Sequence, residues 1–224
     1  MSHRKNLYLH KSKKPAKSKK FKWVLLLFIL SSIYVIFFYT NDYIINRSKY
    51  ALENTEQNYG REVDSLCEKM NLPKAYIKAL IMLETGGKVP VTTRFEEHVY
   101  NKLKQVKTGK KKQYESITTA MLRHTSDESL RNMATSWGPF QIMGYKCVQL
   151  RIKLHNLRGN DAVYWGMKWI SDDYGELLRE GRFKDAFHLH NTGKLYPLTG
   201  ESLTYDPSYV SHGLKYMTFF KSKK

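Results

Sequence analysis

The chain has 224 residues, a net charge of +18 and 42% hydrophobic residues. Its apolar and aromatic content excludes an intrinsically disordered protein. The charge is uneven, because residues 1–22 carry nine Lys or Arg and no acidic residue, whereas residues 23–224 carry 29 basic and 20 acidic residues, a net charge of +9. A basic body of this kind indicates an anionic partner, such as nucleic acid, anionic lipid or a cell-wall polymer.

An uncharged, strongly apolar stretch follows the basic tail. With Phe21 and Thr40 at its ends it is about twenty residues long, enough to cross a hydrocarbon core as a helix. We therefore expect a basic cytoplasmic tail over residues 1–22 and a transmembrane anchor over residues 23–40 of the inner (cytoplasmic) membrane, with the C-terminal part outside. A cleaved signal peptide is the alternative, but the apolar run is longer than a usual h-region and no A-x-A pattern follows it.

The rest of the chain is expected to form a juxtamembrane spacer over residues 41–60 and one mainly α-helical domain over residues 61–224. About 180 residues after the anchor are enough for a globular domain with a sizeable core. Two cysteines, Cys67 and Cys147, are too few for a disulfide framework. We expect them to be small apolar core residues, with a disulfide between them as the alternative.

Two helices are predicted on either side of Asn71-Leu72-Pro73, with Asn71 as the cap of the second. The second helix is unusually apolar, and Glu84 is its last acidic residue before Thr85-Gly86-Gly87 ends it. Partial burial there would disfavour the carboxylate and raise its pKa, the state that a general acid for glycoside cleavage requires. The alternative is an exposed glutamate, which the helix dipole slightly disfavours near a C-terminus.

The middle of the chain predicts short elements. Residues 114–124 and 127–133 are expected to be short helices, and Lys104 to Lys112 a solvated basic loop. Gly138-Pro139 excludes a regular helix, so the string SWGPFQIMG from residue 136 is predicted to be a buried turn or short strand, with Gln141 aimed inward and in need of a hydrogen-bond partner. Helical spacing of apolar residues predicts three further helices, over residues 160–180, 182–190 and 207–219.

Four motifs occur in an order typical of one family. They are Glu84 before two glycines, Phe95-Glu96-x-His98, SWGPFQIMG, and His190-Asn191-Thr192-Gly193. In this order they resemble the bacterial and phage N-acetylmuramidase family, which is related to goose-type lysozymes and soluble lytic transglycosylases. The resemblance covers residues 60–219, and the tail and the predicted anchor lie outside it.

The resemblance implies a lysozyme-like α-helical fold with a cleft between two lobes, and a peptidoglycan substrate. It implies that Glu84 is the general acid, which protonates the oxygen between N-acetylmuramic acid and N-acetylglucosamine. It further implies that Ser136, Gln141 and Asn191 line the cleft and hold the sugar or its acetamido group. Tyr209 corresponds to a family tyrosine near the same cleft.

The second catalytic group stays open. Glu96 stands where the family's Phe-Glu motif has its acid, and it is a candidate base for an attacking water or a structural partner of Arg94 or His98. Glu97 is an additional acid of this sequence and a further candidate for catalysis or substrate binding. Hydrolysis usually requires two carboxylates. If neither serves, the substrate's own acetamido or 6-hydroxyl group would assist, and the product would be an anhydro sugar, as in lytic transglycosylases.

Other readings have less support in the sequence. Neither an HExxH motif nor a glycine-rich phosphate loop occurs, and neither cysteine has an activating context, so we expect no metal, no cofactor and no cysteine nucleophile. A domain outside the membrane is not expected to bind nucleic acid. The serious rival is an inactive peptidoglycan-binding scaffold. A tethered enzyme would cut locally, for a secretion, conjugation or division complex, or serve as a phage lysis enzyme.

Overall fold

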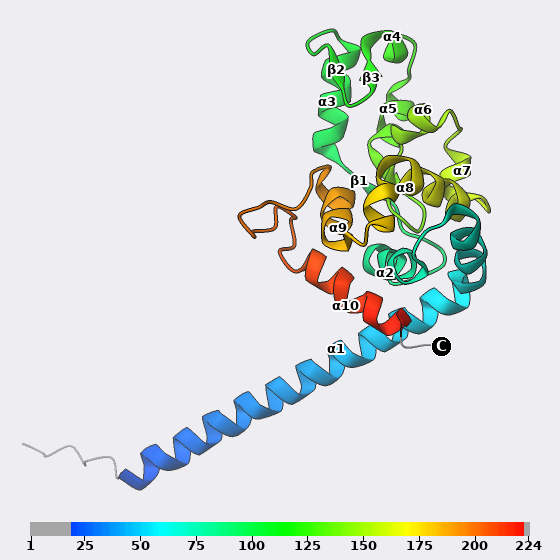
Figure 1. The fold of residues 1–224 in the computed structure, drawn as a ribbon. Helices are drawn as coiled ribbons and strands as arrows, with labels where there is room; N and C mark the ends of the chain where they lie inside the picture. The colour runs from blue at the N-terminus through cyan, green and yellow to red at the C-terminus, as the bar shows by residue number, and fades with distance from the viewer. Residues whose placement is uncertain (1–18, 222–224) are drawn as a thin grey trace, which may run out of the picture. The chain divides into compact units, whose positions relative to one another are not determined.

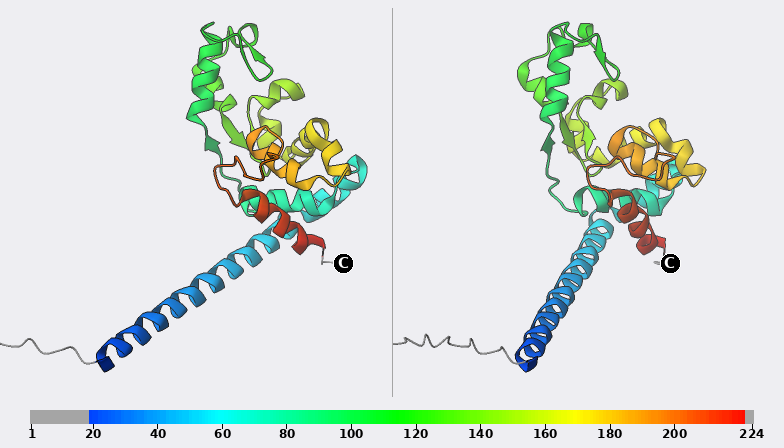
Figure 2. Two further views of the ribbon diagram at one scale, coloured as in Figure 1. Left: turned by 60° about the vertical axis from the view of Figure 1, so that its left-hand side comes forward. Right: turned by 90° about the vertical axis from the view of Figure 1, so that its left-hand side faces the viewer.

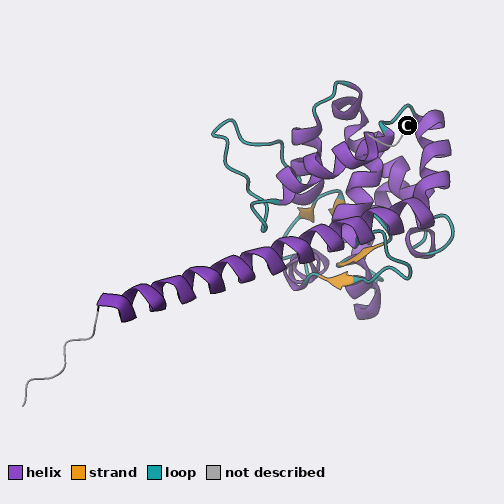
Figure 3. Cartoon of the chain, turned by 90° about the horizontal axis from the view of Figure 1, so that it is seen from below, coloured by secondary structure: helices purple, strands orange, loops and turns teal. Residues whose placement is uncertain are grey.

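The structure is a computed structural model that describes the backbone of residues 19–221 and the side chains of residues 26–36 and 48–221. The chain divides into two compact units, Met1–Arg47 and Ser48–Lys224. Most of the described chain is helical (Figure 3), which confirms the predicted mainly α class. The helices are α1 (Lys19–Met70), α2 (Lys74–Thr85), α3 (Glu97–Lys107), α4 (Thr119–Leu122), α5 (Asp127–Met133), α6 (Lys146–Leu150), α7 (His155–Arg158), α8 (Ala162–Arg179), α9 (Phe183–Thr192) and α10 (Tyr209–Lys221).

The predicted anchor, residues 23–40, lies within α1. The side chains of residues 23–25 and 37–40 lie outside the described residues, as do those of the predicted basic tail, residues 1–22. Among the residues that the structure does describe, no helix has an apolar stretch long enough to cross a membrane. The anchor and the tail therefore stay predictions.

The globular unit begins earlier than predicted. Residues 41–60 were expected to be a spacer, but the second unit starts within them, and Thr55 and Tyr59 are buried in it. Together with Val63 and Cys67 they form a buried stripe at four-residue spacing along α1, the spacing of one helix face. The stripe begins with a polar residue, and this is why apolar periodicity placed the boundary at residue 61.

The junction between α1 and α2 differs in one detail from the prediction. Asn71 adopts a left-handed conformation with φ 51°, and the Leu72 amide donates to the Cys67 carbonyl at 3.0 Å. This is how an asparagine ends a helix. Asn71 therefore terminates α1, and Pro73 occupies the N-cap position of α2 that was predicted for Asn71.

The second unit contains two hydrophobic cores. The main core takes its buried residues from the C-terminal part of α1 and from α2, α8, α9 and α10, and the small core takes them from α3, α4, α5 and their neighbours. In Figures 1 and 2, α3 and α4 lie at one end of this unit and α2, α9 and α10 at the other. Phe95 and Glu96 lie directly before α3, and the SWGPFQIMG string follows α5. Both motifs are therefore placed where elements of the two cores meet.

A three-stranded antiparallel sheet contains the SWGPFQIMG string. Its order is β1 (Arg94–Phe95), β4 (Thr135–Trp137) and β5 (Ile142–Met143), with Arg94 opposite Ser136. The predicted short strand and turn are thus confirmed. Gly138, in the turn, has φ 71°, and a Cβ there would lie 2.5 Å from the Leu157 carbonyl oxygen, so the position requires glycine.

The predicted helix over residues 114–124 is wrong in its first half. β2 (Gln113–Tyr114) and β3 (Ile117–Thr118) form a hairpin there, and only α4 is helical. The turn is made by Glu115, with φ 51°, and Ser116. The β-branched run that starts at Ile117 favours an extended strand over a helix, and this outweighs the helical spacing of the apolar residues.

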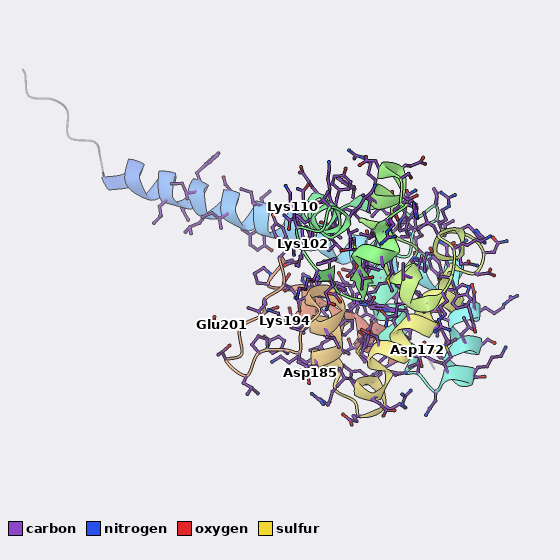
Figure 4. All side chains as sticks on the ribbon, turned by 90° about the horizontal axis from the view of Figure 1, so that it is seen from above. Lys102, Lys110, Asp172, Asp185, Lys194 and Glu201 are labelled. Atoms are coloured by element: carbon purple, nitrogen blue, oxygen red, sulfur yellow. The ribbon has the colours of Figure 1, made fainter. Side chains whose placement is uncertain are left out.

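The connection between α9 and α10 is long and has exposed apolar side chains, among them Leu198 and Tyr205. Figure 4 shows Lys194 and Glu201 on this connection, and Lys102 and Lys110 on α3 and the turn after it. Of the predicted basic loop, Lys104 and Lys107 are instead part of α3.

Candidate active site

Glu84 lies at the end of α2 with its carboxyl group turned into the protein. Its side chain is 15% exposed. The hydroxyl of Tyr209, the first residue of α10, donates a hydrogen bond to Glu84 Oε1. Burial raises the pKa of Glu84 to about 7, although the hydrogen bond from Tyr209 and the positive charge of Arg94 both act to lower it. Glu84 is therefore a carboxyl group that holds its proton near neutral pH, as predicted for it when buried.

His190, on α9, lies beside Glu84 and is neutral. Its Nε2 is 3.7 Å from Glu84 Oε1 and 3.0 Å from the Phe140 carbonyl oxygen, while its Nδ1 is 2.7 Å from the Tyr174 hydroxyl. A carbonyl oxygen only accepts, so Nε2 carries the proton, and Nδ1 accepts from Tyr174. Burial lowers the pKa of His190 to about 4. The imidazole thus faces Glu84 without a charge.

Tyrosine rings enclose the buried side of this pair. Tyr76 packs against Tyr174 with ring centroids 6.5 Å apart, and burial raises the pKa of both hydroxyls. Burial also holds the pKa of Tyr209 well above its ordinary value, so that this hydroxyl stays a donor to Glu84. Tyr174 lies at a kink inside α8, where its φ is −146°. The site therefore combines side chains from four helices.

Ser136 and Gln141 are bonded to the protein itself. The Ser136 hydroxyl donates to Gln141 Oε1 at 2.7 Å, and Gln141 Nε2 donates to the carbonyl oxygens of Thr92 at 3.0 Å and Gly138 at 3.1 Å. The predicted inward glutamine is thus only partly buried and already has partners. The pair fixes the loop before β1 against the turn between β4 and β5, so its role in the described structure is to shape the site.

Glu96 is held by neighbouring basic side chains. Its side chain is 19% exposed, accepts a hydrogen bond from Arg94 Nε, and lies 3.6 Å from His98 Nδ1. Arg94 also acts on the pKa of Glu84, so the two carboxyl groups share the field of one guanidinium. Glu97 is instead exposed in the first turn of α3, where the helix dipole favours a negative charge.

Asn191 joins the site through Tyr209. It is exposed at the end of α9, and a hydrogen bond with its side chain acts to lower the pKa of the Tyr209 hydroxyl. Of the predicted residues, the structure thus brings Asn191 and Tyr209 to Glu84, and Glu96 into range of the same guanidinium. Ser136 and Gln141 form a separate hydrogen-bonded pair.

His190 and Tyr174 were missed as site residues. His190 is the first residue of the His190-Asn191-Thr192-Gly193 motif, and its place directly before the predicted site residue Asn191 was the signal that could have found it. Tyr174 gave no such signal, because the helical spacing of α8 made it one core residue among several. Only the kink in α8 and the packing of α9 bring its hydroxyl to the imidazole.

The cysteines do not provide an alternative centre. Both are free and buried, and burial raises the pKa of Cys67 to about 12 and of Cys147 to about 11. Such thiols are protonated and unreactive near neutral pH. Within the described part of the chain, no group of three His, Cys, Asp or Glu side chains is placed to hold a metal ion.

Comparisons of the chain with protein-family models, curated protein sequences and solved structures found no match. The resemblance to N-acetylmuramidases thus rests on the motifs alone.

Proposed function

We propose that this chain is a membrane-anchored glycosidase that cleaves the β-1,4 bond between N-acetylmuramic acid and N-acetylglucosamine in peptidoglycan. The observation that carries the proposal is the buried Glu84 carboxyl group, whose pKa is raised to about 7. The order of the sequence motifs, the two cores and the tyrosine that donates to Glu84 support a lysozyme-like domain.

Glu84 acts as the general acid. At pH 7 about half of a carboxyl population with this pKa is protonated, against less than about 1% of ordinary glutamates. The proton goes to the oxygen that bridges the two sugars, and the leaving sugar departs as an alcohol. The Tyr209 hydroxyl then stabilises the carboxylate that remains, because it is already placed as a donor to Oε1.

The other side of the sugar ring can be attacked in two ways. In hydrolysis, Glu96 would activate a water as a base. The ion pair with Arg94 opposes this role, because the guanidinium already occupies Glu96 Oε1, an oxygen that would otherwise be open to accept from the attacking water. That contact favours a second candidate function, lytic transglycosylation, in which the substrate's own 6-hydroxyl group closes an anhydro ring on N-acetylmuramic acid. Glu97 is exposed and is the weaker candidate for the base.

The proposed location is the inner membrane, with the N-terminus in the cytoplasm and the domain in the periplasm or outside the cell. It rests on the apolar stretch of residues 23–40 and on the cations before it. A tethered enzyme reaches only the nearby wall. This supports a local role, in a secretion, conjugation or division complex, over bulk lysis.

The test is digestion of purified peptidoglycan by the full chain in non-ionic detergent. The wild-type protein should release soluble fragments, and Glu84→Gln should reduce the rate at least about 100-fold, the usual contribution of a general acid. The matched control is Glu176→Gln, at a glutamate whose side chain is 81% exposed on α8 and which should leave the rate unchanged. If both proteins bind peptidoglycan and neither releases soluble fragments, the result would instead support an inactive peptidoglycan-binding scaffold.

A further inference from the structure

The turn that follows Glu84 has an unusual backbone. α2 ends at Thr85, and Gly86 and Gly87 both have left-handed conformations, with φ 62° and 67°. The Gly86 amide donates to the Met82 carbonyl at 3.0 Å, and the Lys88 amide donates to the Thr85 carbonyl at 3.3 Å. We call residues 85–88 the acid turn. Because Glu84 directly precedes it, the path of the acid turn determines how the last turn of α2 presents the carboxyl group.

The acid turn packs directly on the backbone of α1. A Cβ at Gly87 would lie 2.4 Å from the amide nitrogen and hydroxyl oxygen of Thr55 and 2.6 Å from its Cα. Thr55 is fully buried, and its hydroxyl donates to the Ala51 carbonyl at 2.7 Å within α1. No side chain therefore fits between helix and turn, and the position of one fixes that of the other.

Two side chains of α1 bind the carbonyl oxygens of the acid turn. Asn58 Nδ2 donates to the Gly87 oxygen at 2.8 Å, and the Tyr59 hydroxyl donates to the Lys88 oxygen at 3.0 Å. Tyr59 is buried, and burial raises the pKa of its hydroxyl, so that it stays a donor. A left-handed turn presents its carbonyl groups away from any helix partner, and these two bonds satisfy them.

An ion cluster around the buried Lys78 holds the same two helices in register. Lys78, on α2, has a side chain only 8% exposed, and it lies 3.0 Å from Glu56 and 3.0 Å from Asp64 of α1. Because this contact is on the helix that ends at Glu84, α1 supports α2 both along its length and at its end. Asn58 and Tyr59, which bind the acid turn, can therefore act on Glu84 without contacting substrate.

We propose that Asn58 and Tyr59 are positioning residues for Glu84, and that they keep its carboxyl group buried by fixing the acid turn against α1. The proposal rests on the function proposed above. It makes the last turns of α1, in a segment that the sequence marked as a spacer, part of the support of the active site. Loosening the turn should let water reach Glu84, so that its pKa falls toward the ordinary value.

The test uses Tyr59→Phe and Asn58→Ala in the full chain in non-ionic detergent, with Gln57→Ala as the matched control. Gln57 is the exposed amide residue next to Asn58. With purified peptidoglycan as substrate, each variant should lower kcat about 3- to 10-fold, the equivalent of one hydrogen bond, and leave KM unchanged. The alkaline limb of the pH profile should move to lower pH. Gln57→Ala should behave as wild type.

A second measurement does not depend on activity. The pKa of Glu84 can be read from the ¹³C resonance of its carboxyl group, assigned by its loss in Glu84→Gln. The pKa of Glu84 should be lower in Tyr59→Phe than in the wild type. Tyr59→Phe deletes only one oxygen atom, so the test relies on this variant in the case where Asn58→Ala does not fold. A kcat, pH profile and Glu84 pKa all equal to wild type would overturn the positioning proposal, as would a change in KM alone. A wild-type rate that Glu84→Gln leaves unchanged would overturn the proposed function instead.

Discussion

Burial acts on Glu84 and His190 in opposite directions, and it leaves both uncharged over the same range of pH. The pKa of the carboxyl group rises to about 7 and that of the imidazole falls to about 4. A protonated His190 at 3.7 Å would stabilise the carboxylate and take away the proton that an acid catalyst needs. The hydrogen bonds of His190 to Phe140 and Tyr174 hold the neutral ring in place, so it helps to keep Glu84 protonated.

The pH dependence of activity follows from this pair. Glu84 must be protonated to act as the acid, so the rate should fall as the pH rises through about 7. Tyr209→Phe removes a hydrogen bond that lowers this pKa, so the alkaline limb should move to higher pH, opposite to the shift expected for Tyr59→Phe. The shift can be checked by measuring the rate at which each protein releases soluble fragments from peptidoglycan between pH 4 and pH 9.

The control for this shift is Tyr205→Phe, at a fully exposed tyrosine of the α9–α10 connection. It removes the same atom from a side chain that is open to solvent and should leave the profile unchanged. A Tyr209→Phe profile that coincides with wild type, or moves to lower pH, would mean that the hydroxyl does not act on the Glu84 carboxylate.

Glu84 should also cost the protein stability at alkaline pH. Folding raises the pKa of Glu84, so the protonated carboxyl group makes its full contribution to the free energy of unfolding below pH 4.5. This contribution is lost as the pH rises through about 7. Glu84→Gln keeps a neutral side chain of the same shape. The variant should therefore gain about 2 to 3 kcal/mol in the free energy of unfolding relative to wild type between pH 4 and pH 8, measured by urea unfolding. An equal difference at both pH values would contradict the buried, raised pKa.

Single residues of the site differed in how well the sequence predicted them. Glu84 could be predicted, because an acidic residue that ends an apolar helix before two glycines is a local pattern. The contact of Tyr209 with Glu84 joins residues 125 positions apart, and only the resemblance pointed to it. The partners of Gln141 could not be predicted, because they are carbonyl oxygens of loops whose paths depend on the fold.

Among the elements, α1 and the turn after α2 pack backbone to backbone at Gly87. The sequence marked Gly86 and Gly87 as the end of α2, and this is confirmed. It did not indicate that Gly87 is also required by its contact with Thr55, because a close backbone approach leaves no pattern in the residues around it. The hairpin over residues 113–118 was missed for a similar reason, since its turn depends on a left-handed glutamate.

The contact at Gly87 can be separated from its backbone conformation. Gly87→Ala and Gly109→Ala both place an alanine at a positive φ, 67° and 74°, but a Cβ at Gly109 meets no atom within 4 Å. Both should therefore pay the same conformational cost, and Gly87→Ala should lose about 1 to 3 kcal/mol more through overpacking. The free energies of unfolding of the two variants give the comparison directly. Equal losses would show that α1 does not constrain the acid turn.

At the scale of the whole molecule, the sequence predicts a tethered enzyme. The apolar stretch of residues 23–40 should keep the full chain in the membrane fraction after an alkaline carbonate wash, because an inserted helix resists the removal of peripheral proteins. A chain that lacks residues 1–47 should appear in the supernatant, since the unit from Ser48 onward is compact by itself. Release of the full chain by carbonate would contradict the anchor.

The role of Glu84 can be tested by the masses of the fragments that the full chain releases from purified peptidoglycan, with Glu84→Gln beside it. We expect fragments that end in N-acetylmuramic acid from the wild type and almost none from the variant. Reducing ends would assign the second step to a water and make Glu96 the candidate base, whereas ends lighter by one water would assign it to the substrate's own hydroxyl group. Fragments released equally by both proteins would contradict the proposed acid catalysis, because the glycosidic bond would then break without the carboxyl group of Glu84.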